Sequence, residues 1–164
     1  FITDYYRAVN NDETKIEKNM GDGRVWFISR QDAALAAANA LNNDLLHREV
    51  LNINGIEPLT YTDFLKIANE VSGNEIKYVK RTDEELYEYF DSIGVPRNTD
   101  GDFSKSPIQA TSEGMVTFGT TVRAGYLDVP VSDFSKLTGR KPLTVRYMFQ
   151  HQADFQLGDR HPTE

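Results

Sequence analysis

Two adjacent tyrosines near the start of the chain are its first residues suited to line a binding site. Tyr5 and Tyr6 lie in residues 1–9, where apolar side chains recur at helical spacing and predict an amphipathic helix. Neighbouring residues on a helix point in different directions, so one ring can face the core while the other lines a cavity. The alternative is that both rings pack as ordinary amphipathic aromatics.

Nucleotide binding would need clustered glycines between a strand and a helix, so that backbone amides can approach a pyrophosphate. The sequence contains neither G-x-G-x-x-G nor G-x-x-x-x-G-K-[ST]. The Gly-Asp-Gly of residues 21–23 precedes a predicted strand instead of a helix, which favours a turn. The Gly-Arg-Lys of residues 139–141 could hold an anion at a helix start. Pro142 and the single glycine favour the end of a helix there.

Metal and acid–base chemistry find weak support. The histidines lack the i, i+4 spacing of a zinc-binding helix, which favours surface positions over a catalytic role. They are His47, His151 and His161. Residues 98–102 alternate like the start of a calcium loop, but the glycine expected at the sixth position is displaced and no glutamate closes the loop, which favours a solvated turn. The acidic residues of 83–91 lie opposite an apolar helix face, which favours a solvated surface over a catalytic carboxylate pair.

Length and composition bound the class of protein. The chain has 164 residues, 39% hydrophobic and 26% charged, and this length predicts one domain. No window approaches the roughly 18 apolar residues of a membrane helix, so we expect a soluble chain without a membrane partner. A net charge of −7 repels phosphate backbones, so we expect no nucleic-acid partner. The lack of cysteine excludes disulfides and fits a cytoplasmic protein.

The elements that must position these residues alternate between strands and helices. An apolar run at residues 25–28 predicts a buried strand, and the Ser29–Asp32 spacing predicts the start of an alanine-rich helix. Residues 50–53 predict another strand, and Pro58 follows within a predicted loop. Because the first residue is Phe and no leader sequence precedes it, we expect a chain cut from something longer.

The second half of the chain continues the alternation. Its predicted elements are a helix capped by Thr60 and ending at Gly73, a strand at 76–79, a helix capped by Thr82, a polar loop at 97–114, a short helix at 132–137 and a helix capped by Thr144. Residues 116–122 are rich in β-branched residues, which favours an extended segment, although Gly119 and Gly125 weaken a long strand. The order of elements predicts α/β or α+β layers.

An ordered set of short motifs covers nearly the whole chain. In chain order these are Phe1-Ile2-Thr3-Asp4-Tyr5-Tyr6, Gly21-Asp22-Gly23-Arg24-Val25, Ser29-Arg30-Gln31-Asp32-Ala33-Ala34, Asn54-Gly55, Leu59-Thr60-Tyr61, Val71-Ser72-Gly73, Ile76-Lys77-Tyr78-Val79, Gly94-Val95-Pro96 and Leu137-Thr138-Gly139-Arg140-Lys141-Pro142-Leu143-Thr144. This set resembles the NmrA-like atypical short-chain dehydrogenases, most closely their quinone-oxidoreductase branch.

The resemblance implies an α/β fold that is the C-terminal part of a Rossmann-like NAD(P)-binding fold plus a small α+β substrate or lid region. Residues 1–57 would supply terminal strands and helices of the sheet, and residues 58–164 the smaller substrate-side region. Asp4 stands where relatives usually carry Glu, and Tyr5 where they carry Asn, whereas Tyr6 matches. The family generally lacks the Tyr-x-x-x-Lys pair, which is also absent here, so no proton donor is assigned.

The function implied by the resemblance is the substrate-side half of an NAD(P)H-dependent oxidoreductase that reduces a quinone or similar electrophile. NADP or NAD would be bound mainly by residues absent from this chain, and the partner would be a small-molecule electron acceptor. The expected acceptor pocket consists of Tyr5, Tyr6, Phe27, Arg30 and Phe118. Strand edges at residues 25–28 and 50–53 without neighbours also predict a homo-oligomer or a missing N-terminal half.

Two alternatives remain open. The first is a redox-sensing regulator of the same family that binds a dinucleotide without turnover and contacts a protein partner. The second is a stand-alone α+β binding module. Oxidation of NAD(P)H by quinones separates an enzyme from a regulator, and a glycine-rich strand–turn–helix encoded upstream would exclude the stand-alone module.

Overall fold

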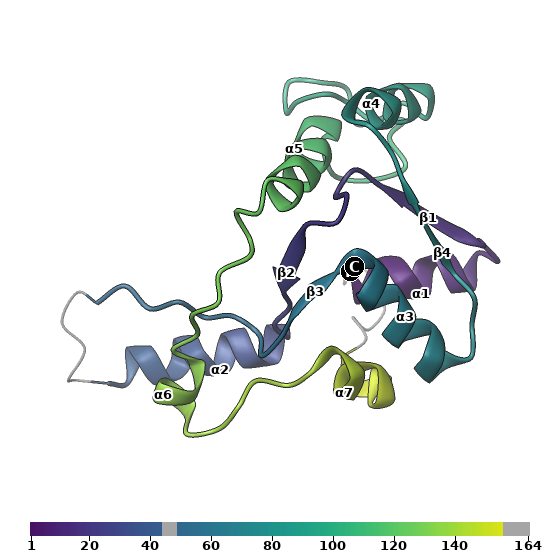
Figure 1. The fold of residues 1–164 in the computed structure, drawn as a ribbon. Helices are drawn as coiled ribbons and strands as arrows, with labels where there is room; N and C mark the ends of the chain where they lie inside the picture. Colours follow the sequence, from purple (N-terminus) through teal and green to yellow (C-terminus); the bar gives the residue numbers. More distant parts are fainter. Residues whose placement is uncertain (44–48, 156–164) are drawn as a thin grey trace, which may run out of the picture.

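Short helices and strands alternate along the chain, and a computed structural model describes residues 1–43 and 49–155. Figure 1 shows how they are arranged. In chain order the elements are α1 (Ile2–Asn10), β1 (Lys15–Lys18), β2 (Arg24–Trp26), α2 (Arg30–Leu41), β3 (Pro58–Thr60), α3 (Tyr61–Ser72), β4 (Lys77–Lys80), α4 (Asp83–Ser92), α5 (Ser112–Arg123), α6 (Phe134–Thr138), α7 (Val145–Gln150) and α8 (Gln152–Phe155). His47 and His161 lie outside the described residues.

The strands form two small sheets. β1 and β4 pair in parallel with Lys15 opposite Lys77, and β2 and β3 pair antiparallel with Val25 opposite Leu59. Parallel strands need a long crossover connection, and the chain between β1 and β4 contains α2 and α3 (Figure 1). The predicted mixture of helices with strands is therefore confirmed.

The main hydrophobic core lies between α1, α3 and α7, with further residues from β1, β3 and α5. Its fully buried side chains include Tyr5, Tyr61 and Phe64, each no more than 1% exposed. Burying one such side chain is worth about 1.5–3 kcal/mol relative to leaving it in water. The core therefore fixes α1 against α3.

Hydroxyl side chains begin the helices at the predicted positions. Thr60 and Thr82 form complete capping boxes at the starts of α3 and α4. The Ser29 hydroxyl accepts a hydrogen bond from the Asp32 backbone N–H at 2.9 Å, which satisfies one of the free amides of α2. Gly73 ends α3 in the left-handed conformation, with φ of 74°.

The strand predicted at residues 50–53 is wrong. Val50 is 91% exposed, and none of these four residues is helical or extended in a sheet. The Asn52 N–H instead donates to the Asp133 carboxylate at 3.0 Å, and the Asp133 N–H donates to the Asn52 carbonyl at 2.7 Å. A strand requires a neighbouring strand that satisfies its backbone groups. Here Asp133, in a loop, satisfies those of Asn52 instead.

The predicted strand at residues 25–28 forms in part. β2 ends at Trp26, and Phe27 and Ile28 lie beyond it. Pro58, which the sequence placed in a loop, instead begins β3 opposite Trp26. Proline is tolerated there because the first residue of a short edge strand need not donate to the ladder. β1 lies in a polar segment for which no strand was predicted, and Ile16 is its one buried residue.

Residues 116–122 are helical, so the extended segment favoured by their β-branched composition is wrong. They belong to α5, whose start is capped by the Thr111 hydroxyl accepting from the Gly114 N–H at 3.1 Å. Val116, Gly119 and Val122 are all buried, and their i, i+3, i+6 spacing is that of one helix face. Packing of this face overrides β propensity.

Two carboxylates connect the early part of the chain to its late part. The Asp32 carboxylate, fully buried, accepts from the Leu143 N–H at 2.7 Å and from Arg140 Nη2 at 2.5 Å. The Asp128 carboxylate accepts from Trp26 Nε1 at 2.9 Å. These contacts hold α2 and β2 against loops more than 100 residues later in the sequence.

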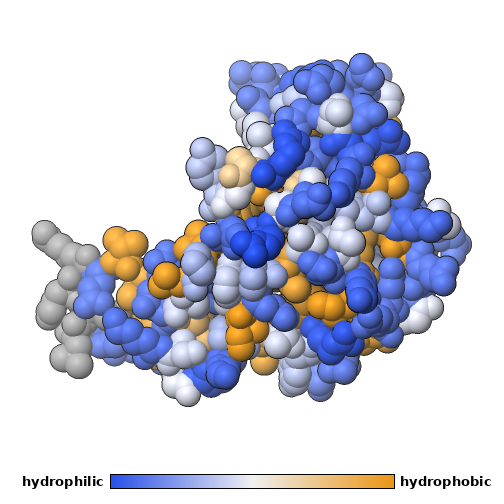
Figure 2. All heavy atoms as spheres, in the orientation of Figure 1, coloured by the Kyte–Doolittle hydropathy of each residue, from blue (hydrophilic) through white to orange (hydrophobic). Residues whose placement is uncertain are grey.

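α2 and α6 lie together in an arm that projects from the rest of the molecule, at the left of Figure 1. Hydrophobic residues are visible on its surface in Figure 2, and Leu41 at the end of α2 is 88% exposed. The division between residues 1–57 and 58–164 stays a prediction. β2 and β3 pair across it, and the core takes residues from both sides.

Candidate functional site

Tyr5 and Tyr6 differ in burial, although their ring centroids lie 5.6 Å apart and both rings contact Phe149. Tyr5 is fully buried, and its hydroxyl donates to Asn69 Oδ1 at 2.9 Å and lies 2.6 Å from Ser72 Oγ. Tyr6 is half-buried, and its ring centroid lies 5.8 Å from that of Phe149. Burial raises the pKa of the Tyr6 hydroxyl, so it stays protonated.

An aromatic cluster forms where α1 begins, between the end of β2, α3 and α5. We define the aromatic cluster as Phe1, Phe27, Tyr61, Phe64 and Phe118. The Phe1 ring centroid lies 4.9 Å from that of Phe27 and 5.9 Å from that of Phe118. The Phe27 ring stacks on that of Phe64 at 5.1 Å. Rings at such distances pack in preferred stacking geometries, and those of Tyr61 and Phe64 are buried in the main core.

The five predicted pocket residues do not form one pocket: Phe27 and Phe118 lie against the same ring, that of Phe1, whereas Tyr5 contacts Tyr6. Phe27 and Phe118 both contact Phe1, and Phe118 is 43% exposed, so this edge of the aromatic cluster is accessible. Tyr5 lies in the core instead. Arg30 is exposed at the first position of α2. A role in acceptor binding stays a prediction for each of these residues.

Tyr6, the fifth predicted residue, lines a separate groove between α1, the end of α3 and α7. The groove has a volume of about 810 Å³. Its other lining residues are Val9, Asn10, Glu70, Val71, Ser72, Asn74, Arg146, Phe149, Gln150 and Gln152. Arg146 Nη2 and Glu70 Oε2 form an ion pair at 2.6 Å among them. The groove is therefore mainly polar, unlike the aromatic cluster.

Tyr61 is a member of the aromatic cluster that the sequence analysis did not single out as a site residue. Among the described residues its hydroxyl is one of two buried side-chain oxygens without a hydrogen bond. Burial, and then the nearby Asp4 carboxylate, raise the pKa of this hydroxyl far above its usual range. Its spacing from Phe64 on one face of a predicted helix was the available signal, but it could not identify the aromatic partners from α5 and the end of β2.

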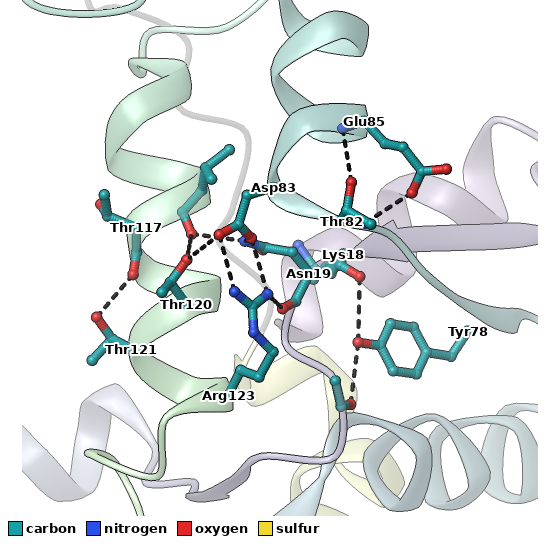
Figure 3. Close-up of polar contacts among 12 residues, drawn as sticks. Lys18, Asn19, Tyr78, Thr82, Asp83, Glu85, Thr117, Thr120, Thr121 and Arg123 are labelled. Carbon is teal, nitrogen blue, oxygen red and sulfur yellow. Dashed lines mark hydrogen bonds and ion pairs between the residues drawn. The ribbon is translucent and has the colours of Figure 1, made fainter.

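A second network fixes α5 to the start of α4, as Figure 3 shows. Arg123 donates to both oxygens of the Asp83 carboxylate, at 2.9 Å each. The amide of Asn19, which is 1% exposed, donates to Asp83 Oδ1 at 2.7 Å and to the Val116 carbonyl at 2.8 Å. Thr120 Oγ1 donates to Asp83 Oδ2 at 3.0 Å. These contacts, above all those of Arg123, hold the pKa of the Asp83 carboxyl well below its usual range.

The glycine turn at residues 21–23 does not fit a pyrophosphate. A Cβ added to Gly23 would lie 2.1 Å from the Val122 carbonyl oxygen, so the backbone of the turn packs directly against α5. Gly139 ends α6, and the Arg140 side chain is bound to Asp32. Both segments therefore have structural roles, as the sequence analysis favoured.

Other chemistry is absent from the described part of the chain. Residues 1–43 and 49–155 hold no group of three or more acidic or histidine side chains suited to a metal ion. Over the same residues no helix is long and apolar enough to cross a bilayer. The His151 ring is exposed and stacks on Tyr147 with a centroid distance of 4.0 Å. Among the described residues the aromatic cluster therefore offers ring faces and no metal-binding group.

Comparison with known proteins relates this chain to oxidoreductases. It is 31% identical to agroclavine dehydrogenase of Claviceps fusiformis over 144 residues, which are 88% of this chain and 43% of that protein. It is 28% identical over 96 residues to the uncharacterized oxidoreductase YesF of Bacillus subtilis, covering 58% of this chain and 34% of that protein. No family model matches the chain.

Solved structures share the fold. The NADPH-dependent quinone oxidoreductase QOR2 of Escherichia coli, complexed with NADPH, superposes with a TM-score of 0.77 and 18% identity over 93% of this chain and 49% of that one. The chain thus spans about half or less of the length of the proteins it matches. Because it shares the fold over nine-tenths of its own length, the predicted α/β fold is confirmed.

Proposed function

We propose that this chain is the acceptor-side half of an NAD(P)H-dependent oxidoreductase that reduces a quinone or a similar planar electrophile. The observation that carries the proposal is the aromatic cluster, whose accessible edge is the Phe118 ring, 43% exposed, with the half-buried Phe27 on the other side of Phe1. A flat conjugated acceptor gains both apolar burial and stacking energy against such rings. Similarity to agroclavine dehydrogenase and to the fold of a quinone oxidoreductase supports the same class of reaction.

Neither glycine segment of the described chain is free to hold a dinucleotide, which supports a cofactor held by a partner half. The glycine turn at residues 21–23 is packed against α5, and Arg140 is engaged by Asp32. NADP or NAD would supply the hydride when bound. The part of this chain is to bind the acceptor, to orient it and to exclude water from one side.

The projecting arm of α2 and α6 is the surface that we assign to that partner half. Leu41 and Val50 at its end are 88% and 91% exposed, and Leu35 on α2 is 36% exposed. The backbone of Asn52 is already bonded to Asp133, so the feature left for a partner is the set of exposed apolar side chains. A dinucleotide-binding half that covers these side chains would remove them from water.

NAD(P)H oxidation with a panel of quinones, measured on the complete polypeptide, tests the proposal. We expect quinone-dependent turnover by the complete polypeptide and no NADPH binding near a Kd of ~1 μM by the chain alone, as followed by calorimetry. Tight binding of NADPH to the chain alone would contradict the need for a partner half. Binding of the cofactor without turnover on any quinone would favour the redox-sensing regulator instead.

A further inference from the structure

α4 and α5 form a unit with a small core of its own. Leu86, Val95 and Val116 are buried at 5%, 3% and 2% exposure, yet they lie outside the main core. In Figure 1 this unit lies at the top of the molecule, beyond the ends of β1 and β4. Val122 is the buried residue of α5 in the main core, and Phe118 contacts Phe1 at the edge of that core. Few apolar side chains of the unit therefore reach the main core.

Hydrogen bonds and an ion pair of Asn19 and Asp83 add to these few apolar contacts. They engage α5 at Val116, Thr120 and Arg123, which lie along one face of the helix (Figure 3). Arg123 Nη1 also donates to the Asn19 carbonyl at 2.7 Å, which closes the network. Because the donors and acceptors are directional, they fix both the rotation and the axial position of α5.

The fit of α5 against Asn19 leaves no room for sliding. A Cβ added to Gly119 would lie 1.7 Å from Asn19 Oδ1, so the side-chain amide sits directly on the helix backbone. Phe118 is the residue that precedes this contact, and its ring faces Phe1 in the aromatic cluster. The position of the Phe118 ring therefore depends on the contacts of Asn19 and Asp83.

We propose that Asp83 is a positioning residue for the acceptor, because it fixes α5 and so holds Phe118 at the accessible edge of the aromatic cluster. The acceptor part of this inference rests on the proposed function. Asp83 does not touch the aromatic cluster itself; its ligands are Asn19, Thr120 and Arg123. Its effect reaches the acceptor through the placement of one helix.

Asp83→Asn tests the inference, with Asp91→Asn as its matched control. Asp91 lies on the same helix, and its carboxylate binds Arg97 in the same two-point manner, at the end of α4 away from Asn19. In hydrogen exchange we expect Asp83→Asn to raise the rates of the α5 amides about tenfold, and Asp91→Asn to leave them within about twofold of wild type. Unchanged α5 exchange in Asp83→Asn would overturn the inference whatever the activity.

Kinetics of the complete polypeptide with a water-soluble naphthoquinone supply the second measurement. We expect Asp83→Asn to raise KM for the quinone about tenfold and to change kcat less than about twofold, since the residue affects only where the acceptor is held. Arg123→Lys keeps the charge and loses the two-point contact, so its KM should lie between those of the wild type and Asp83→Asn. If Asp83→Asn does not fold, Thr120→Val is used in its place in both measurements, because it removes one hydrogen-bond donor to Asp83.

The outcomes separate this inference from the proposed function. If Asp83→Asn speeds exchange of the α5 amides but has the same KM and kcat as Asp91→Asn, Asp83 is purely structural and its positioning role is overturned. A wild-type polypeptide without any quinone turnover would refute the proposed function, and the acceptor role of Asp83 with it. The exchange rates would then still decide whether Asp83 fixes α5.

Discussion

Asp32→Ala should destabilise the chain much more than Asp63→Ala, although both aspartates occupy the third position of a capped helix. Asp32 is the third residue of α2 and Asp63 the third of α3, so their interactions with the helix dipole are matched. They differ in burial: the Asp32 side chain is 0% exposed, whereas Asp63 lies at the surface. The comparison therefore isolates the cost of a buried carboxylate that bridges distant segments.

The magnitude follows from the partners that each variant leaves behind. Removing the Asp32 carboxylate leaves the Leu143 N–H without its acceptor at 2.7 Å, which costs about 1–3 kcal/mol for a buried group. Arg140 also loses its partner, but its side chain is 42% exposed and can be resolvated, so the full cost of about 3–5 kcal/mol for a broken buried pair is not reached. We therefore expect a loss of about 3 kcal/mol, against about 1 kcal/mol for the Asp63 capping box.

Thermal and urea unfolding followed by circular dichroism measure the difference. At about 2–4 °C per kcal/mol for a chain of this size, Tm should fall by about 6–12 °C in Asp32→Ala and by about 2–4 °C in Asp63→Ala. Asp32→Asn keeps the shape of the side chain and one acceptor for the Leu143 N–H, so its loss of Tm should lie between those of Asp32→Ala and Asp63→Ala. Equal losses of stability in the two alanine variants would refute the bridging role of Asp32.

Three further predictions concern α5, pH and the aromatic cluster. Gly119→Ala should lower Tm although alanine normally stabilises a helix by about 1 kcal/mol, because its Cβ would collide with Asn19; a higher Tm would contradict the close contact. Arg81 and Lys15 lower the pKa of the Glu17 carboxyl from 4.5 to about 2, so the stability that they confer is present above pH 4.5 and is lost as pH falls towards 2. Urea titrations at several pH values should find that Glu17→Gln reduces this loss, and an unchanged pH dependence would contradict it. Phe118→Ala should raise KM for a planar acceptor about tenfold, which corresponds to about 1.4 kcal/mol, and a larger effect from Tyr6→Ala would move the acceptor to the groove.

Helix boundaries were predictable because their signals are local. Thr60 and Thr82 each precede an acidic residue by three positions, and the same four residues contain both halves of a capping box. Gly73 likewise ends α3 through its own backbone conformation. Such features need no information about the rest of the fold.

Sheet pairing and helix packing depend on distant residues, and there the sequence analysis failed. Residues 50–53 have the composition of a strand, but a strand forms only where a neighbour satisfies its backbone. Residues 116–122 have β-branched composition, but the buried contacts of α5 with Asn19 favour a helix. The aromatic cluster was predicted only in part for the same reason, since Phe27 and Phe118 meet through tertiary packing.

The contacts of Asp32 and Asp128 have a consequence for the order in which the chain acquires structure during synthesis. Trp26 reaches its hydrogen-bond partner 102 residues later, and the Asp32 carboxylate is bound by a backbone group 111 residues later. Contacts of such sequence separation slow folding, because a long loop must close before they form. Until Leu143 has been synthesised, the first turn of α2 keeps its Ser29 cap but lacks the bridge between Asp32 and Leu143. The alanine-rich helix is therefore fixed in place long after its own synthesis, and its packing face stays exposed in the meantime.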